Sequence, residues 1–265
     1  MAIDNDANGG SLDRGGRLTV AADDDNLRGS LADLSQLTMG HGQEGLEGLL
    51  KHVAEYAVRA IPGADGAGLT LLEADRVDTM VASTDFVQEV DAVQYGIGEG
   101  PCITAAASGQ TVMSGALSLE PRWPRFGPEV ERLGVHSALS LPLKTANGVV
   151  GAMNIYAHAK NAFDERAVEL GELFAIPAAI SVHNARVLAE TRRLTIQVQR
   201  AVASRAVIDR TVGIFMNRNG GSADEALARL EAMSRAKHGK LADVAQRVLD
   251  DSTHAPELRA PTSDG

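Results

Sequence analysis

Cysteine and aromatic residues are scarce in this chain of 265 residues, which has one cysteine, one tryptophan, three tyrosines and five phenylalanines. With Cys102 as the only cysteine, a disulfide within the chain and a site that needs several thiolates are both excluded. His136 and His158 have no partner at a metal-ligand spacing, so no metal site is predicted. The few aromatic rings also leave little material for platforms on which nucleic-acid bases stack.

Long apolar runs and catalytic motifs are missing as well. No stretch approaches the roughly 20 apolar residues that a membrane-spanning helix needs, and there is no export signal, so the cytoplasm is the expected compartment. No nucleophile, base and orienting group stand in a recognisable catalytic motif. Gly96, Gly98 and Gly100 lack the strand-to-helix context of a dinucleotide-binding loop. We therefore expect a protein that has no catalytic residues and no cofactor.

Charge is distributed unevenly along the chain. The formal net charge is −10, but residues 1–189 hold 13 Lys and Arg against 25 Asp and Glu, whereas residues 190–250 hold 11 against 7. A basic segment attached to an acidic body favours an anionic partner such as nucleic acid, because Lys and Arg release condensed counterions from phosphates. The alternative is a solvated helical surface with a modest local excess of positive charge.

The basic segment is predicted to form three short amphipathic helices. The first stops at Asn219-Gly220-Gly221, because these residues readily adopt the left-handed conformation at a helix end. Ser222 and Glu225 have the spacing of a capping box and predict the start of the second helix. Gly239 breaks the chain before a third helix that carries apolar residues at helical spacing from Leu241.

Several stretches of this segment occur in the order found in a known family. They are Arg205, the run from Ile208 to Met216, Ser222-Ala-Asp-Glu-Ala226, Leu230, Ser234 and Lys240-Leu-Ala-Asp-Val-Ala245. Together they resemble the ANTAR domain, a three-helix RNA-binding module of transcription antiterminators. The resemblance implies a regulatory, non-catalytic protein that recognises paired RNA hairpins with short exposed loops, one of which excludes a terminator stem.

The segment departs from the family pattern at Arg210-Thr211-Val212. Members often have Gln-Ala there, followed by Lys or an aliphatic residue. Thr211 therefore places a hydroxyl near a close helix contact, and Val212 removes a possible phosphate contact.

Basic and polar side chains are the candidates for contact with RNA. Hairpin loops expose unstacked bases, whereas the A-form major groove is too narrow to read. Phe215, the only aromatic residue of the module, lies among apolar neighbours and is expected in the core. The candidates are Arg205, Arg210, Asn217, Arg218, Arg235, Lys237, Lys240 and Arg247. For each basic residue the alternative is an exposed charge in solvent, and Asn217 and His238 are also suited to capping a helix.

Residues 40–185 predict a larger unit of a different kind. Strands are expected at residues 66–72, 76–82, 136–143 and 148–156, where β-type runs alternate with glycine breaks. Helices are expected at residues 45–60 and from the cap at Asp164 onward. Helix, strands and helix over about 150 residues describe an α+β domain of the size of a sensor.

Four local sequences make this unit similar to a known sensor fold. They are Asp65-Gly-Ala-Gly-Leu-Thr-Leu-Leu72, Gln94-Tyr-Gly-Ile-Gly-Glu-Gly-Pro-Cys102, Glu120-Pro-Arg-Trp-Pro-Arg-Phe126 and Gly151-Ala-Met-Asn-Ile-Tyr156. They resemble the GAF domain that precedes an ANTAR domain in actinobacterial proteins. The resemblance implies an α+β GAF sensor domain with a central antiparallel sheet and flanking helices. A long coiled-coil helix and a small all-α three-helix ANTAR domain are expected to follow.

Four residues of the sensor region are candidates for a ligand pocket: Tyr95, Cys102, Trp123 and Met153. Cys102 follows Gly100-Pro101 at the expected start of a helix, which is compatible with a redox or haem role, and the alternative is a buried structural cysteine. Trp123 is expected either to wall a pocket or to anchor its loop under an Arg. GAF domains as a class bind unrelated ligands, so the resemblance does not identify the signal.

A long connecting helix is predicted between the two domains. Apolar residues recur every seven positions at Leu173, Ile180, Val187, Leu194, Ala201 and Ile208. This repeat indicates a coiled-coil seam and a parallel homodimer, although a helix packed back on its own sensor domain explains the first half equally well. Pro177 is expected to kink the helix. Changes in the sensor domain are expected to alter the register or splay of the seam.

These observations divide the chain into five expected parts. They are a disordered acidic tail at 1–28, a GAF domain at 29–185, a connecting helix at 164–207, an ANTAR domain at 195–250 and a disordered tail at 251–265. The predicted function is a dimeric RNA-binding antiterminator that responds to a small molecule or a redox cue. The alternative is a DNA-binding regulator, since three basic helices are also compatible with a major-groove reader.

Overall fold

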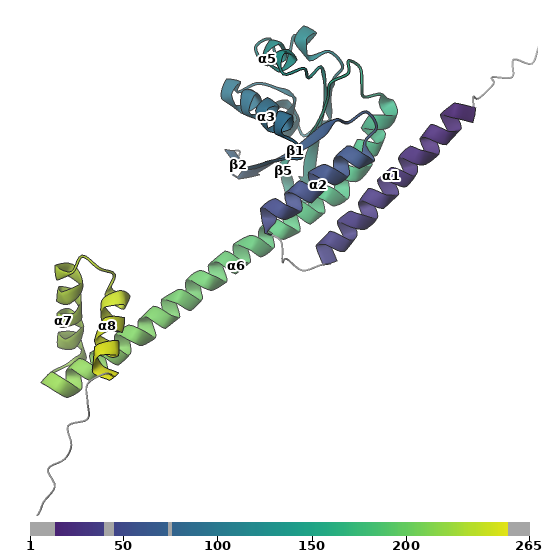
Figure 1. Ribbon diagram of the computed structural model, residues 1–265. Helices are drawn as coiled ribbons and strands as arrows, with labels where there is room; N and C mark the ends of the chain where they lie inside the picture. The colour runs from purple at the N-terminus through teal and green to yellow at the C-terminus, as the bar shows by residue number, and fades with distance from the viewer. Residues whose placement is uncertain (1–13, 40–44, 74–75, 254–265) are drawn as a thin grey trace, which may run out of the picture. The chain divides into compact units, whose positions relative to one another are not determined.

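The computed structural model describes residues 14–39, 45–73 and 76–253 (Figure 1). They belong to two compact units that meet in sequence between Ala189 and Glu190. Helix α6, Glu165–Asn219, contributes residues to both units and continues through Pro177 as one helix. None of the described helices is long and apolar enough to cross a membrane.

A five-stranded antiparallel sheet forms the centre of the first unit. Its strands are β1 (Gly66–Glu73), β2 (Arg76–Ala82), β3 (Val112–Ser114), β4 (Ser137–Thr145) and β5 (Gly148–Ala157). Their order across the sheet is β2-β1-β5-β4-β3. The four predicted strands are therefore confirmed within one or two residues at each end. Strand β3 was not predicted, because three residues are too few to show an alternating pattern.

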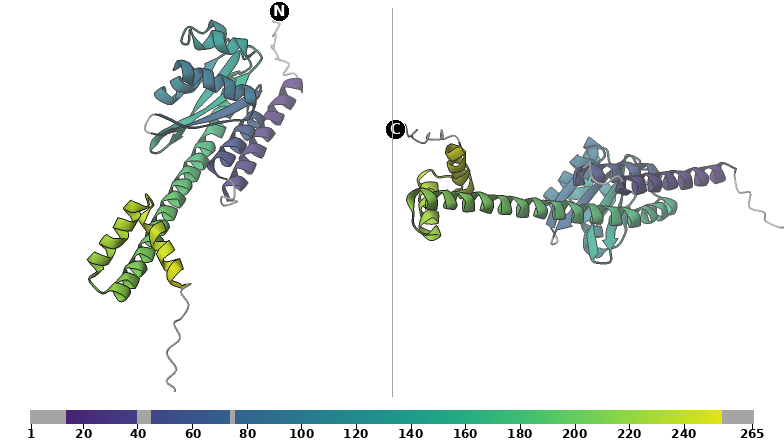
Figure 2. Two further views of the ribbon diagram at one scale, coloured as in Figure 1. Left: turned by 60° about the vertical axis from the view of Figure 1, so that its left-hand side comes forward. Right: turned by 90° about the horizontal axis from the view of Figure 1, so that it is seen from below.

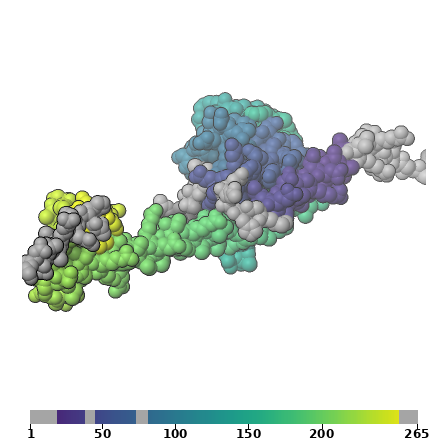
Figure 3. Space-filling view, turned by 60° about the horizontal axis from the view of Figure 1, so that its bottom comes forward, coloured from purple at the N-terminus to yellow at the C-terminus, as the bar shows by residue number. Residues whose placement is uncertain are grey.

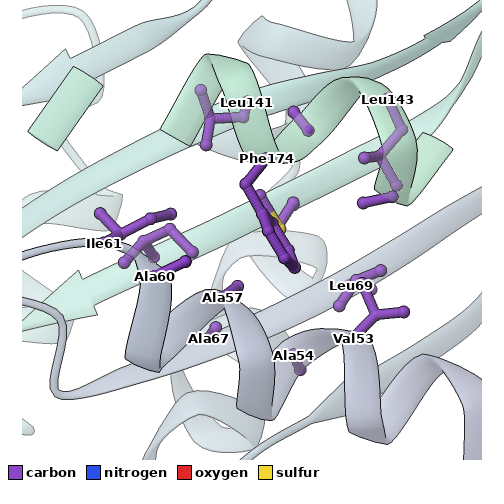
Figure 4. Packing of buried hydrophobic residues seen from close by; sticks show 14 of the residues in the cluster. Val53, Ala54, Ala57, Ala60, Ile61, Ala67, Leu69, Leu141, Leu143 and Phe174 are labelled. Carbon is purple, nitrogen blue, oxygen red and sulfur yellow. The ribbon is translucent and has the colours of Figure 1, made fainter. Parts of the chain in front are cut away.

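One face of the sheet is apolar and is covered by α2 (Leu46–Ala60) and the first part of α6 (Figures 1 and 2). In Figure 4 the ring of Phe174 points from α6 toward Ala57 and Ala54 of α2, above strands that carry Leu69 and Leu141. The small side chains of α2 leave room for this ring. All five side chains are fully buried, as expected for a close-packed core.

The opposite face is covered by α3 (Asp85–Ile97) and α4 (Pro101–Ser108), and α5 (Phe126–Arg132) packs against α3 and a 3-10 turn at Leu117–Leu119. Its apolar residues, which include Val87, Val90, Trp123 and Phe126, form a second cluster. Gly98 and Gly109 end α3 and α4 in the left-handed conformation. The helix start expected at Gly100-Pro101 is confirmed by α4. Helices α3 and α5 were not predicted, because Asp91 interrupts the apolar face of α3 and the seven residues of α5 are too few to show a helical period.

Helix α1, Arg14–Met39, corrects the expected disorder of residues 1–28. Leu27 and Leu34 are buried in the core cluster shared with α2 and α6, and the Arg59 side chain donates a hydrogen bond of 3.1 Å to Ser30. Arg166 of α6 forms an ion pair with Asp24. The prediction was wrong for residues 14–28, because helix α1 is stabilised by packing on the sensor unit rather than by its own pattern. Residues 1–13 lie outside the described residues.

The second unit contains the end of α6, α7 (Ala223–Ala236) and α8 (Leu241–Thr253). Both parts of the predicted capping box are present, since Glu225 N donates to Ser222 Oγ and Ser222 N donates to Glu225 Oε2. Leu230, Val244 and Ala245 form the buried centre, against which Phe215 packs. Of the predicted disordered tail, residues 251–253 are helical, and residues 254–265 lie outside the described part.

Candidate nucleic-acid interface and sensor interior

Thr211 joins the long helix to the last helix of the second unit. Its side chain is fully buried, and its hydroxyl lies 2.9 Å from the Val207 carbonyl oxygen and 3.1 Å from the Ala245 carbonyl oxygen. The single hydroxyl proton is shared between an acceptor on α6 and one on α8. The departure from the family pattern at this position thus adds a polar contact between two helices.

All eight side chains predicted to contact RNA are exposed. Asn217 and Arg218 lie at the end of α6, before the turn into α7. Arg235, Lys237 and Lys240 lie at the other end of α7, about 21 Å away for a helix of 14 residues. The remaining candidates are Arg205 and Arg210 on α6 and Arg247 on α8. The candidates therefore do not form one continuous patch.

The turn between α7 and α8 gathers the largest group of positive charges. His238 has a φ of 47°, and Gly239 follows it. The guanidinium of Arg247 lies near Gly239, because a Cβ added to this glycine would be 3.4 Å from Nη2. Arg235 forms only a weak ion pair of 3.6 Å with Glu231. Arg235, Lys237, Lys240 and Arg247, here called the basic turn, form the strongest candidate for a phosphate-binding surface.

A network of buried polar side chains lies between the sheet and α3. Tyr156 Oη donates a hydrogen bond of 2.7 Å to Asp91 Oδ1, and Asn154 Nδ2 donates one of 3.2 Å to the same oxygen. Ser140 Oγ donates to Asn154 Oδ1 at 3.0 Å. All four residues are at most 3% exposed. Burial raises the pKa of Asp91 to about 7, and the hydrogen bonds from Tyr156 and Asn154 only partly oppose this rise.

Tyr95 and Cys102 lie together beside this network. Tyr95 Oη and Cys102 Sγ are 2.9 Å apart, and Cys102 N donates to Gln94 Oε1 at 2.9 Å. Burial raises the pKa of the Cys102 thiol to about 11, and the negative charge of Asp91 adds to the rise. The thiol is therefore protonated near neutral pH and is a weak nucleophile.

Of the other two residues predicted to line a ligand pocket, Trp123 lies on the same side of the sheet as Tyr95 and Cys102, whereas Met153 lies on the opposite side. The Trp123 indole nitrogen donates to Thr104 Oγ1 at 3.0 Å, and the Arg122 guanidinium lies 4.5 Å from the ring centroid. Met153 is fully buried in the apolar core on the α2 and α6 side of the sheet. The grouping of Met153 with Tyr95 and Cys102 is corrected, because alternate residues of β5 point to opposite faces.

Asp91 is the residue that sequence analysis missed. It lies in α3 among Val87, Val90 and Gln94, which are all buried. A carboxylate within the apolar face of an amphipathic helix is unusual, and this interruption was the available signal. Among the described residues no group of three or more His, Cys, Asp or Glu side chains is arranged to hold a metal ion.

Family models account for both units of the chain. A model of the GAF domain matches residues 43–183, more than half of the chain, and a model of the ANTAR domain matches residues 197–249. The chain belongs to the GAF-ANTAR proteins. Its two domains make it a regulator with a sensor part and an RNA-binding output. Helix α1 lies before the matched GAF region.

Several solved structures of GAF domains and of related proteins are similar to part of this GAF-ANTAR chain. The GAF domain of a phosphoenolpyruvate-protein phosphotransferase from Coxiella burnetii is 21% identical, with a TM-score of 0.49 over 62% of this chain and 97% of that one. A putative GAF sensor protein from Burkholderia vietnamiensis is 15% identical, with a TM-score of 0.47 over 63% and 98%. Free methionine-R-sulfoxide reductase from Neisseria meningitidis is 17% identical, with a TM-score of 0.45 over 61% and 91%. No curated protein matches the chain.

Asp91→Asn is expected to change how stability depends on pH. Folded Asp91 keeps its proton up to a pKa of about 7, whereas an unfolded carboxyl loses it near pH 4. The stability that this group contributes is therefore present below about pH 4 and is lost as pH rises through about 7. Relative to the wild type, the Asn variant should gain about 1.4 kcal/mol per pH unit between these values. Urea unfolding followed by Trp123 fluorescence measures the difference, and parallel pH profiles would contradict the assignment.

Thr211→Val is expected to loosen α8. Removing the hydroxyl should cost about 1 kcal/mol and raise the exchange rates of α8 amide hydrogens about fivefold. Thr211→Ser retains the hydroxyl and serves as the control, with rates close to those of the wild type. Hydrogen exchange of the intact protein distinguishes the two variants. Equal protection of α8 in Val and Ser variants would show that the hydrogen bond adds no stability.

Proposed function

We propose that this protein is a dimeric, signal-responsive transcription antiterminator without enzymatic activity. In this proposal the sensor domain responds to a small molecule or a redox cue. Two ANTAR modules then bind paired RNA hairpins that compete with a terminator. The family match of residues 197–249 is the observation that carries the RNA-binding part, and the proposal adds the paired target, the dimer and the signal.

The basic turn supports contact with the RNA backbone. Its four cations are exposed, and within the described residues the only ion pair that involves them is the weak one between Arg235 and Glu231. Exposed cations that neutralise phosphates release counterions and give an affinity that falls with salt. The module is poor in aromatic residues, and Phe215 packs against its core. Base recognition is therefore assigned to Arg planes and amide side chains rather than to a stacking platform.

An exposed apolar stripe on α6 supports the dimer. Leu173, Ile176 and Ile180 are 48%, 62% and 53% exposed, although Phe174 and Ala178 between them are buried against the sheet. The helix therefore packs back on its own sensor domain with one face and presents a second apolar face outward. Part of the exposed surface of α6 is visible in green in Figure 3. Farther along the helix the same kind of surface continues at Leu188, Leu194, Val198 and Val202, all of which are exposed.

The RNA target is tested by measuring the affinity of the protein for a paired-hairpin RNA from the genome of origin. The same measurement with a single hairpin and with duplex DNA, across a salt series, provides the comparison. Lys237→Glu/Lys240→Glu should weaken binding and reduce the slope of log affinity against log salt by about 0.7 to 0.9 for each lost phosphate contact. Arg132→Glu/Lys160→Glu makes the same charge change on exposed residues of the sensor domain and should leave both quantities unchanged. Tighter binding to duplex DNA than to the hairpins would instead support a DNA-binding regulator.

Leu194→Glu tests the dimer. A charge in an apolar seam should shift the protein toward a monomer in light scattering and reduce the preference for paired over single hairpins. Ile196→Glu is the matched control, because Ile196 is 47% exposed and lies on the opposite side of the helix, 200° from Leu194. A monomeric wild type, or equal loss of the dimer in both variants, would contradict the assignment of the seam.

A further inference from the structure

A cavity of about 580 Å³ opens beside strand β2, and no predicted site residue lines it. Its walls come from the first turns of α2, the end of β2 and the first half of α3. Four of its lining residues carry charge: Glu47, Lys51, Asp85 and Asp91. Its volume lies in the range of small-molecule sites.

Asp91 forms the buried part of this cavity. It is 3% exposed, yet it is one of the lining residues. Its Oδ1 accepts both hydrogen bonds from Tyr156 and Asn154, whereas Oδ2 has no hydrogen-bond partner in the described part of the chain. A buried carboxylate with one free oxygen is costly unless a donor or a cation reaches it. The cavity is the side from which such a group can approach.

Gly68 of β1 makes room for this oxygen. A Cβ added to Gly68 would lie 2.6 Å from Asp91 Oδ2, which is too close for any side chain. Because Gly68 has no side chain, Oδ2 of Asp91 can lie directly against strand β1. This contact also provides a second way to disturb the site, from a different element of the fold.

The other charged residues that line the cavity do not neutralise the negative charge of ionised Asp91. Asp85 lies in the first turn of α3, where a negative charge offsets the positive end of the helix dipole. Glu47 and Lys51 stand four residues apart on α2, and Lys51 is the only basic residue among the described residues that line the cavity. Glu47 and Asp85 are both exposed at the rim. The described lining of the cavity therefore combines one buried carboxylate and two exposed carboxylates with one lysine.

We propose that this cavity binds a small aliphatic diamine, with one ammonium group on Oδ2 of Asp91 and the other near the rim carboxylates Glu47 and Asp85. The proposal rests on the proposed sensor function and names the chemical class of its ligand. The buried contact with Asp91 supplies most of the binding affinity, because a charge-assisted hydrogen bond is stronger away from water. The exposed rim contacts select for a second positive charge.

Binding of a diamine should depend on pH through Asp91. The titratable groups around it are Tyr95 on α3, Cys102 on α4 and Tyr156 on β5, and burial raises the pKa of each. These three are therefore uncharged near pH 7, where Asp91 itself titrates. The ammonium group needs the ionised carboxylate, so affinity should rise as pH increases through about 7. In the part of the cavity wall that the structure describes, the other charged residues are Glu47, Asp85 and Lys51.

Isothermal titration of the full-length protein with 1,4-diaminobutane tests the proposal, with 1-aminobutane and 1,4-butanediol as matched probes. The expected order of affinity is diamine, monoamine and then diol. Asp91→Asn retains an oxygen that can accept from Tyr156 and Asn154 and should lower the affinity for the diamine at least about tenfold, the equivalent of one charge-assisted hydrogen bond. Glu89→Gln makes the same change at an exposed site on α3 and should leave the affinity unchanged.

Gly68→Ala provides the second variant and should also weaken binding, by pressing on Asp91 Oδ2. Circular dichroism confirms that each variant is folded. The proposal is overturned by absence of diamine binding at millimolar concentration, by equal binding of the diol, or by unchanged binding to Asp91→Asn. The titration contains no RNA, so absence of diamine binding would not contradict the proposed antiterminator function. If the protein binds the diamine but does not bind hairpin RNA, the antiterminator function is rejected and the diamine site is retained.

Discussion

The packing of α6 against the sheet is the contact on which the remaining structure depends. Phe174 and Ala178 bury one side of the helix in the sensor core, while Leu173 and Ile180 face outward from the same turns. A helix with a single apolar stripe buries it against one neighbour, whereas α6 also has a second, exposed apolar face. The helix then runs on to Asn219, where its final turns become part of the ANTAR module. One continuous helix therefore contributes to the sensor core, carries the exposed apolar face proposed as a dimer seam and ends in the RNA-binding domain.

The alternation of side chains along β5 divides the sensor interior into two different environments. Met153 and Ile155 point into the apolar core, while Asn154 and Tyr156 between them point toward α3. The first side is packed with hydrocarbon and gives stability. The second side holds hydrogen-bonded polar groups around Asp91, and such groups give a site its chemical selectivity.

The sequence allowed the long elements and both domains to be predicted, since β1, β2, β4, β5 and the capping box at Ser222 all carry local patterns. The pairing of Tyr95 with Cys102 was within reach, but the place of Met153 depended on the register of β5. Asp91 was missed because its partners lie on β5, 63 and 65 residues away in the sequence. Helix α1 was missed because its stability comes from neighbours rather than from its own composition.

Trp123 has a consequence for how the molecule can be observed. It is the only tryptophan of the chain, and it is buried beneath Arg122 with its indole nitrogen on Thr104 of α4. Thr104 lies two residues beyond Cys102 in the same short helix. When tryptophan is excited selectively, at wavelengths that tyrosine does not absorb, the emission therefore arises from a single ring next to the helix that borders the polar network. A shift of α4 changes the polarity around that ring, so the chain carries its own optical probe of the sensor interior.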